Sequence, residues 1–254
     1  MKIMWFVNKV YLWGRSVIRL NERDILLVSY PKTGSTWIRY YLYVLLMQKS
    51  GESKMTIDAM NGSMPEFANP SFFMNWQFSE CHRIVKTHQK YLTLFSKNKG
   101  VLIVRDPRDI VISYYYYVLG LKAHGFKGSI SDLLRDRKMG LKPFFQHYAS
   151  WQTHVGLILR YEDLKENPIE GFSRLAAFYG IERSQEEILQ AIDASNFSNM
   201  RTAQEKSSQL KSEFKEGHQF VRSGKKEQWK SLFSDDDRMY YESLKKEYKF
   251  DLYD

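Results

Sequence analysis

Asp24-Ile-Leu-Leu-Val-Ser-Tyr-Pro-Lys-Thr-Gly-Ser-Thr-Trp37 is the stretch that decides the fold. Its first half, residues 24–29, is a short apolar run with β-branched residues, which is typical of a buried strand in a parallel sheet. Its second half turns through Gly34 into a segment with helical periodicity. Such a turn presents backbone N–H groups and the positive end of the helix dipole, which together attract an anion. The sequence therefore predicts an anion-binding loop after the first strand.

The same pattern of strand and helix repeats along the chain. The other expected strands are residues 83–86, 100–104 and 155–159. The expected helices are residues 35–48, residues 109–119, the helix that Asn167-Pro168 begins and Gly180 ends, and the helix that Ser184 caps together with Glu187. This alternation predicts an α/β fold in which helices flank both faces of a mostly parallel sheet, with ligands at the carboxyl ends of the strands.

Size and composition indicate one globular domain. The chain has 254 residues, of which 43% are hydrophobic, and this is enough for a sizeable core. No repeat, low-complexity tract or linker divides it, so we expect a single domain over residues 1–254. The net charge of +9 favours nucleotides, acidic membranes or nucleic acid, although dispersed basic residues also suit an ordinary solvated surface. Because no nucleic-acid module is recognisable, no nucleic-acid partner is expected.

The cysteine content and the N-terminus both bear on location. The single cysteine, Cys81, excludes an intrachain disulfide and fits a reducing cytoplasm. Residues 1–20 predict an amphipathic helix, because Asn8, Lys9 and Arg15 interrupt its apolar groups too often for a membrane span. The apolar face either packs on the domain's own core or rests on a membrane surface, and both interpretations are open here. We expect a cytoplasmic protein without stable membrane insertion.

Three consecutive aspartates near the C-terminus mark the start of a helix. Ser234 is a favourable N-cap, and the aspartates at 235–237 fall in the first turn, where carboxylates interact favourably with the helix dipole. We therefore interpret them as helix-start residues and not as metal ligands. No other grouping of His, Cys, Asp and Glu in the sequence suggests a metal ion, so no metal is expected.

The loop of residues 30–37 has the chemistry of an anion site. Lys32 adds a full positive charge, and Trp37 can wall the site or stack on a ligand. The hydroxyl donors of the loop are Thr33, Ser35 and Thr36. The loop is not a Walker A motif, because its lysine precedes Gly34 and the second glycine of that motif is missing. A magnesium–ATP enzyme is therefore disfavoured.

Two further strand ends carry candidate site residues. Arg105 follows residues 100–104, and its planar guanidinium can engage phosphate oxygens bidentately; a surface pair with Asp106 is the alternative. Ser113 lies about two helical turns beyond Arg105. His88, in Ile84-Val-Lys-Thr-His-Gln89, is the only one of the six histidines that follows an expected strand in this way. A histidine there can take the proton from an attacking hydroxyl or amine.

The order of these motifs resembles the family of sulfotransferases that depend on 3′-phosphoadenosine 5′-phosphosulfate (PAPS). The resemblance covers about residues 24–230 and includes a late glycine-containing loop, Gln219-Phe-Val-Arg-Ser-Gly-Lys-Lys-Glu-Gln-Trp-Lys230. It implies a three-layer, P-loop-like fold. It also implies that the 5′-phosphosulfate is bound by Lys32, Thr33, Gly34, Ser35, Thr36 and Trp37. The implied 3′-phosphate ligands are Arg105, Ser113, Arg222, Ser223 and Gly224, and the implied adenine contacts are Tyr161 and Phe197.

The resemblance further implies a reaction and its catalytic residues. The sulfonate of PAPS would pass to a hydroxyl or amine of a small organic acceptor, with release of 3′-phosphoadenosine 5′-phosphate (PAP). His88 would act as general base, Lys32 would neutralise the leaving oxygen and Lys86 would assist. Residues 51–78, an irregular and aromatic stretch, would form the acceptor pocket or its lid, and a hydrophobic cap on the core is the alternative.

This chain departs from the family pattern in two places. Ser223 stands where cytosolic members usually carry lysine, and Glu227 stands where they usually carry glycine. One phosphate contact is then either lost or taken up by Lys225 or Lys226. The segment from Ser234 to Met239 lacks most of the family's dimer motif, so the oligomeric state stays open. Two other function classes also stay open: a nucleotide-dependent kinase, and a non-catalytic protein that binds a nucleotide or nucleic acid.

Overall fold

The core of the protein is a four-stranded parallel sheet. A computed structural model describes residues 2–49 and 55–253. Within them the strands β1 (Ile25–Ser29), β2 (Ile84–Thr87), β3 (Gly100–Val104) and β4 (Leu157–Arg160) lie in the order β2-β1-β3-β4. Each neighbouring pair is parallel. All four strands fall where the sequence predicts them, although β4 begins two residues later than expected.

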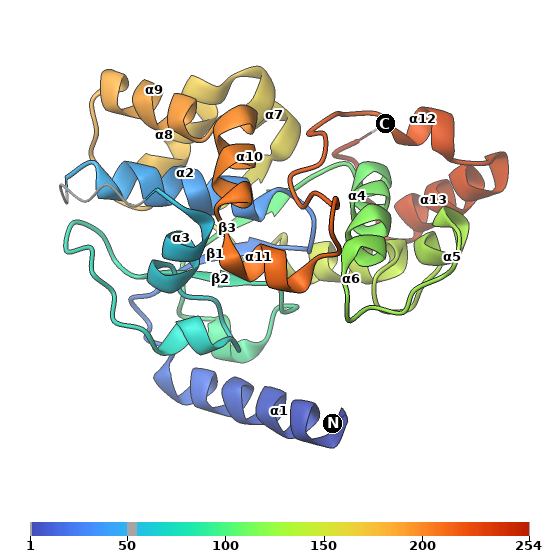
Figure 1. The fold of residues 1–254 in the computed structure, drawn as a ribbon, viewed down its shortest axis with the longest axis horizontal. Helices are drawn as coiled ribbons and strands as arrows, with labels where there is room; N and C mark the ends of the chain where they lie inside the picture. The colour runs from blue at the N-terminus through green and yellow to red at the C-terminus, as the bar shows by residue number, and fades with distance from the viewer. Residues whose placement is uncertain (1, 50–54, 254) are drawn as a thin grey trace.

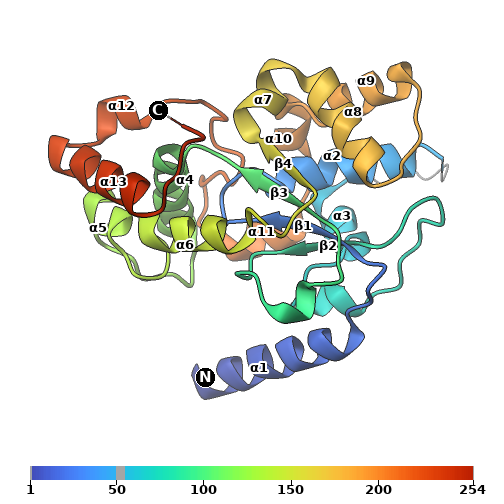
Figure 2. The same ribbon diagram turned by 180° about the vertical axis from the view of Figure 1, so that it is seen from behind.

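Helices cover both faces of this sheet, as Figures 1 and 2 show. Successive side chains of β1 point to opposite faces, so Ile25 and Leu27 join one hydrophobic core while Leu26 and Val28 join the other. The first core is closed by α2 (Ser35–Met47), α8 (Pro168–Phe178) and α9 (Gln185–Ala194). The second is closed by α4 (Pro107–Gly120), α6 (Leu141–Trp151) and α13 (Asp235–Glu247). The prediction of a three-layer α/β fold is confirmed.

The other elements complete the described chain. The remaining α-helices are α1 (Lys2–Arg19), α3 (Ile57–Ser63), α5 (Ile130–Leu134), α7 (Tyr161–Glu166), α10 (Phe197–Glu205), α11 (Ser208–Glu213) and α12 (Trp229–Leu232). The 3₁₀ turns are η1 (Pro70–Phe73) and η2 (Thr93–Phe95). None of the described helices is both long enough and apolar enough to cross a membrane.

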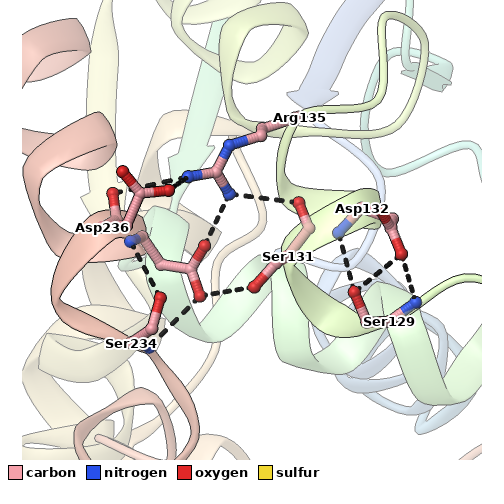
Figure 3. A network of polar contacts seen from close by, with 7 residues as sticks. Ser129, Ser131, Asp132, Arg135, Ser234 and Asp236 are labelled. Atoms are coloured by element: carbon pink, nitrogen blue, oxygen red, sulfur yellow. Dashed lines mark hydrogen bonds and ion pairs between the residues drawn. The ribbon is translucent and has the colours of Figure 1, made fainter.

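The predicted helix boundaries are confirmed by their caps. Ser184 and Glu187 form a reciprocal capping box at the start of α9, and Gly180 has a positive φ of 73° just beyond α8. Ser234 and Asp237 form a second capping box at the start of α13. The aspartates there also tie α13 to α5, since Arg135 binds Asp236 and Asp237 while the Ser131 hydroxyl donates to Asp237 at 2.7 Å. Figure 3 shows this network, in which the acidic turn has a structural role.

Of the segment of residues 51–78, the structure describes residues 55–78, and this part is more regular than the sequence suggests. Residues 51–54 lie outside the described part of the chain. The described part contains α3 and η1, and its residue Phe67 donates its N–H to the Lys86 carbonyl at 2.8 Å, beside β2. The side chains of Phe67, Phe72 and Phe78 are buried in the two cores. These rings therefore cap the core.

Helix α1 attaches to the domain by one face only, and of the predicted residues 1–20 it comprises Lys2–Arg19. The Ser16 hydroxyl is buried and accepts the N–H of Ala68 at 3.1 Å. The Trp13 ring meets the Phe67 ring edge to face, with 6.4 Å between centroids. Both contacts are with the segment that leads into η1.

Candidate active site

The first loop adopts a backbone conformation that requires its glycine. Lys32 and Gly34 both have positive φ angles, 73° and 94°. A β-carbon on Gly34 would lie 2.6 Å from the Tyr161 ring, so a larger residue cannot be placed there without a shift. The turn delivers the chain into α2, which begins at Ser35. The N-terminus of α2 and the loop amides can therefore face an anion.

A cavity of about 730 Å³ opens at the carboxyl ends of the strands and gathers nearly all the predicted site residues. Those that line it are Lys32, Gly34, Ser35, Thr36, Trp37, Lys86, His88, Arg105, Ser113, Tyr161, Phe197, Arg222, Ser223 and Gly224. Thr33 is the exception, because its buried hydroxyl donates to the Tyr30 carbonyl at 2.9 Å. Thr33 therefore stabilises the turn and does not face the cavity.

Lys32 lies in the cavity close to two aromatic rings and to other basic residues. Its ammonium lies 4.0 Å from the centroid of the Tyr117 ring and 4.4 Å from that of Phe220. Burial, followed by the neighbouring charges of Arg105, Lys86 and Arg222, lowers the pKa of Lys32 to about 7. An anionic ligand between these cations would reverse that effect and restore the charge of Lys32.

Arg105 is held in place by several contacts at the wall of the cavity. Only 6% of the residue is exposed, and its guanidinium lies 4.6 Å above the Tyr161 ring. It donates to the carbonyls of Lys32 and Lys225 at 3.4 and 3.3 Å. Its Nε has no partner among the described residues. The guanidinium is therefore preorganised and retains unused donor capacity for a phosphate.

The late loop is tied to the start of α4. The Asp109 carboxylate accepts the N–H groups of Glu227 and Gln228 at 2.7 and 2.9 Å. Gln228 in turn accepts a bond from Arg222 at 2.6 Å, which places that guanidinium at the cavity wall. Glu227 adopts a positive φ of 58°, a region that favours glycine.

The lysine that supports this loop is not one of those considered from the sequence. Lys226 is paired with Glu166, and neither Lys225 nor Lys226 lines the cavity. Lys165 of α7 does line it, and its ammonium donates to the Gly224 carbonyl at 2.6 Å. Lys165 lies four residues after Tyr161 on α7, so the two side chains share one face of the helix. This spacing was the signal in the sequence that could have identified Lys165 as a site residue.

His88 is fixed in one tautomer by its neighbour. Its Nδ1 lies 2.6 Å from the carbonyl oxygen of Ser29. A carbonyl only accepts, so Nδ1 carries the proton and the lone pair is on Nε2. Burial, with a further contribution from Lys86, lowers the pKa of His88 to about 3. The imidazole is therefore neutral at ordinary pH with Nε2 unprotonated, and in the empty cavity it is a weaker base than a solvated imidazole.

Glu66, which sequence reasoning missed, completes this side of the cavity. Its carboxylate is 3.0 Å from the Lys86 ammonium, and a parallel bridge joins the two backbones. Burial alone would raise the pKa of Glu66, but Lys86, His88 and Arg39 lower it to about 2. Burial lowers the pKa of Lys86, whereas Glu66 opposes that change. Glu66 is the only charged residue between Met64 and Met74, and this was the sole hint in the sequence.

The fold and the cavity define a class: an α/β protein with a cavity at the strand ends that several basic side chains line. The family model described as sulfotransferase domain matches residues 22–248. Sulfotransferase 1 family member D1 of Mus musculus is 30% identical over 233 residues, which cover 83% of this chain and 78% of that protein. Sulfotransferase 6B1 of Danio rerio is 27% identical over 232 residues, covering 86% and 75%.

Solved structures share the fold. Retinol dehydratase in complex with androsterone and inactive cofactor PAP aligns with a TM-score of 0.73 at 18% identity, over 97% of this chain and 85% of that one. Mouse sulfotransferase SULT7A1 complexed with PAP gives 0.70 at 20% identity, over 95% and 89%. The chain belongs to the sulfotransferase family, and the protein is a PAPS-dependent sulfotransferase.

Proposed function

We propose that the protein transfers the sulfonate group of PAPS to a hydroxyl or amine of a small organic acceptor, with His88 as general base. The observation that carries this proposal is the 2.6 Å contact between Nδ1 of His88 and the Ser29 carbonyl, at the wall of the cavity that Lys32 also lines. This contact leaves the Nε2 lone pair as the available base. A single-domain protein acting in the cytoplasm remains our expectation.

His88 and Lys32 serve the two ends of one in-line displacement. His88 takes the proton of the acceptor hydroxyl or amine at Nε2 while the acceptor atom forms its bond to sulfur. The bond between sulfur and the 5′-phosphate oxygen breaks, and negative charge develops on that oxygen. Lys32, protonated in the presence of the anionic donor, neutralises the charge. The products are the sulfonated acceptor and PAP.

Lys86 is proposed to stabilise the sulfonate during transfer, held in place by Glu66. The ion pair at 3.0 Å keeps a buried ammonium charged although burial lowers its pKa. Arg39 of α2 helps to fix the backbone that carries Glu66, because it donates to the Met64 carbonyl at 2.7 Å. Glu66 is thus a positioning residue, whereas Lys86 contacts the transferred group.

The donor nucleotide is proposed to span the cavity between α2 and the late loop. The residues proposed to bind its 3′-phosphate are Arg105, Ser113, Arg222, Ser223 and Gly224, with Lys165 in addition. The Tyr161 and Phe197 rings would contact the adenine, and Trp37 would wall the site. The loop amides with Ser35 and Thr36 would hold the 5′-phosphosulfate.

The acceptor is proposed to be a small molecule with an apolar frame. Tyr114, Tyr117 and Phe220 contribute rings to the cavity wall, which suits an aromatic or alicyclic compound. The structural relatives are consistent with this class, because retinol dehydratase was crystallised with androsterone and with retinol. Those ligands are properties of that protein and guide only the choice of compounds to test.

The test is transfer of radiolabelled sulfonate from PAPS to a panel of phenols, alcohols and amines. The wild-type protein should label at least one compound without added metal, and His88→Ala should lower that turnover about 10²- to 10⁴-fold, the usual contribution of a general base. The affinity of His88→Ala for PAP should stay within about twofold, since His88 makes no proposed contact with the nucleotide phosphates. Equal turnover in His88→Ala would refute its role as base, and loss of PAP binding would indicate a structural role.

A further inference from the structure

Helix α1 presents an apolar stripe to solvent. Val7, Val10, Tyr11 and Ile18 are 58%, 55%, 55% and 84% exposed. Val10, Tyr11 and Ile18 lie three, four and eleven residues after Val7, a spacing that places all four side chains on one side of an α-helix. Figures 1 and 2 show α1 at the edge of the molecule, away from the helices that cover the sheet. No described segment of the chain covers this stripe.

The opposite side of α1 is fixed to the domain. Ser16 accepts the N–H of Ala68, and Val17 and Leu20 pack against the second core. Arg83 donates to the Arg19 carbonyl at 3.3 Å, which ties down the last turn of the helix. The helix is therefore anchored with its apolar stripe facing outward, so the stripe cannot close onto the core without breaking these contacts.

The charges of α1 decide between two possible occupants of the stripe. The sequence of the helix contains Lys2, Lys9, Arg15 and Arg19 and no acidic residue. Arg15 flanks the stripe, lying 4.7 Å above the Phe73 ring and donating to the Tyr11 hydroxyl at 2.9 Å. A second copy of this chain would bring two basic helices together on a protein of net charge +9, which is unfavourable. An anionic lipid surface is complementary to the same charges.

We propose that the face of α1 formed by Val7, Val10, Tyr11 and Ile18 binds the surface of anionic bilayers, with the helix lying in the headgroup region. Binding is peripheral and reversible, because the apolar area is small and the charge attraction is screened by salt. The anchored side of α1 contacts Phe67 and Ala68, the residues that directly follow Glu66. Helix α1 thus contacts two residues that are next in sequence to Glu66, which lines the proposed acceptor side of the cavity.

The experiment is co-sedimentation of the full chain with vesicles of phosphatidylcholine alone or mixed with phosphatidylserine. Wild-type protein should sediment with the mixed vesicles, less so at high salt, and weakly with phosphatidylcholine. The double variant Val10→Asp with Ile18→Asp should lower the affinity at least about tenfold, because each change removes an aliphatic contact and adds a negative charge. Both side chains are exposed, so the melting temperature should not change.

A matched control tests whether loss of vesicle binding is specific to α1 or follows from changing any exposed apolar residue to aspartate. Met239 is 65% exposed and belongs to a different helix, α13, so Met239→Asp should bind vesicles as the wild type does. Failure of the wild type to bind mixed vesicles would overturn the proposal, as would unchanged binding by the double variant. A wild-type dimer in light scattering that the double variant converts to a monomer, without vesicle binding by either, would assign the stripe to a second copy instead.

Discussion

The two halves of the cavity are built in different ways. The half with Lys32 and Arg105 is made from turns that directly follow β1 and β3, and its geometry is fixed by backbone conformation and by short sequence motifs. The half with Glu66 and His88 combines a strand end with a segment positioned by packing on α1 and β2. The proposed phosphate-binding half therefore has a local signature in the sequence, whereas the proposed acceptor side depends on contacts between distant residues.

This difference predicts that substitutions in the two halves change different measurements. Changes on the donor side should alter the affinity for PAP, and changes on the acceptor side should alter turnover at saturating PAPS. A variant that alters both would show that the division is wrong. The predictions below run from the largest expected effect to the smallest.

Arg105→Ala should weaken PAP binding about 10- to 100-fold, because hydrogen bonds to charged groups typically contribute about 1.5 to 3 kcal/mol. Isothermal titration calorimetry with PAP measures this directly. Arg137→Ala is the matched control, since Arg137 is an exposed arginine that does not line the cavity. If both variants bind PAP as the wild type does, Arg105 is only a structural residue that holds Lys32 and Lys225 together.

The affinity for PAP should fall as the pH rises above about 7, by up to about tenfold per pH unit. In the free protein the pKa of Lys32 is lowered to about 7, so at higher pH the ammonium must regain a proton when the anion binds. Below that pH Lys32 is already charged and its contribution levels off. Lys32→Met should bind PAP more weakly and with a flatter profile between pH 7.5 and 9.5. A profile that Lys32→Met leaves unchanged would assign the titration to another group.

Glu66→Gln should lower kcat about tenfold while the affinity for PAP stays within about twofold. The amide removes the charge that keeps Lys86 protonated, and it also removes a charge that favours protonation of His88. The loss should therefore be greater at high pH, where Lys86 deprotonates. Glu66→Asp keeps the charge and should recover part of the activity. A uniform loss across the pH range in both variants would indicate misplaced backbone and not a charge effect.

Glu227→Gly should raise the free energy of unfolding by about 1 kcal/mol, because the left-handed conformation costs an L-residue about that much. Denaturant titration measures the change, and Glu227→Ala should not share it because it retains a β-carbon. The bonds from Glu227 and Gln228 to Asp109 involve backbone N–H groups and should persist. A destabilised glycine variant would mean that chain entropy outweighs the relief of strain.

Much of the donor side could be predicted from the sequence, for physical reasons. Gly34 is required by a positive φ and by the closeness of Tyr161, and its turn is immediately followed by a helix, so the signal is local. Strands β1 and β3 were recognisable because they are buried on both faces and therefore largely apolar. The boundary of β4 was less clear, since several of its residues are only partly buried.

The acceptor side shows where such reasoning fails. The aromatic stretch of residues 51–78 predicted either an acceptor pocket or its lid, or a cap on the core. In its described part, residues 55–78, Phe67, Phe72 and Phe78 are in the cores and only Glu66 lines the cavity. Glu66 belongs to no recognisable sequence motif. Its position in the site depends on the ion pair with Lys86, which is 20 residues away in the sequence. Thr33 was predicted to contact the ligand, but its hydroxyl donates to the Tyr30 carbonyl, and the sequence does not distinguish these two roles.

The most direct test of the account is a calorimetric titration of PAP into the purified protein with EDTA present, compared with ADP with and without magnesium. The account predicts tight metal-free binding of PAP and much weaker binding of ADP, because ADP lacks the 3′-phosphate proposed to contact Arg105 and the late loop. Binding of ADP that requires magnesium, with no preference for PAP, would contradict it.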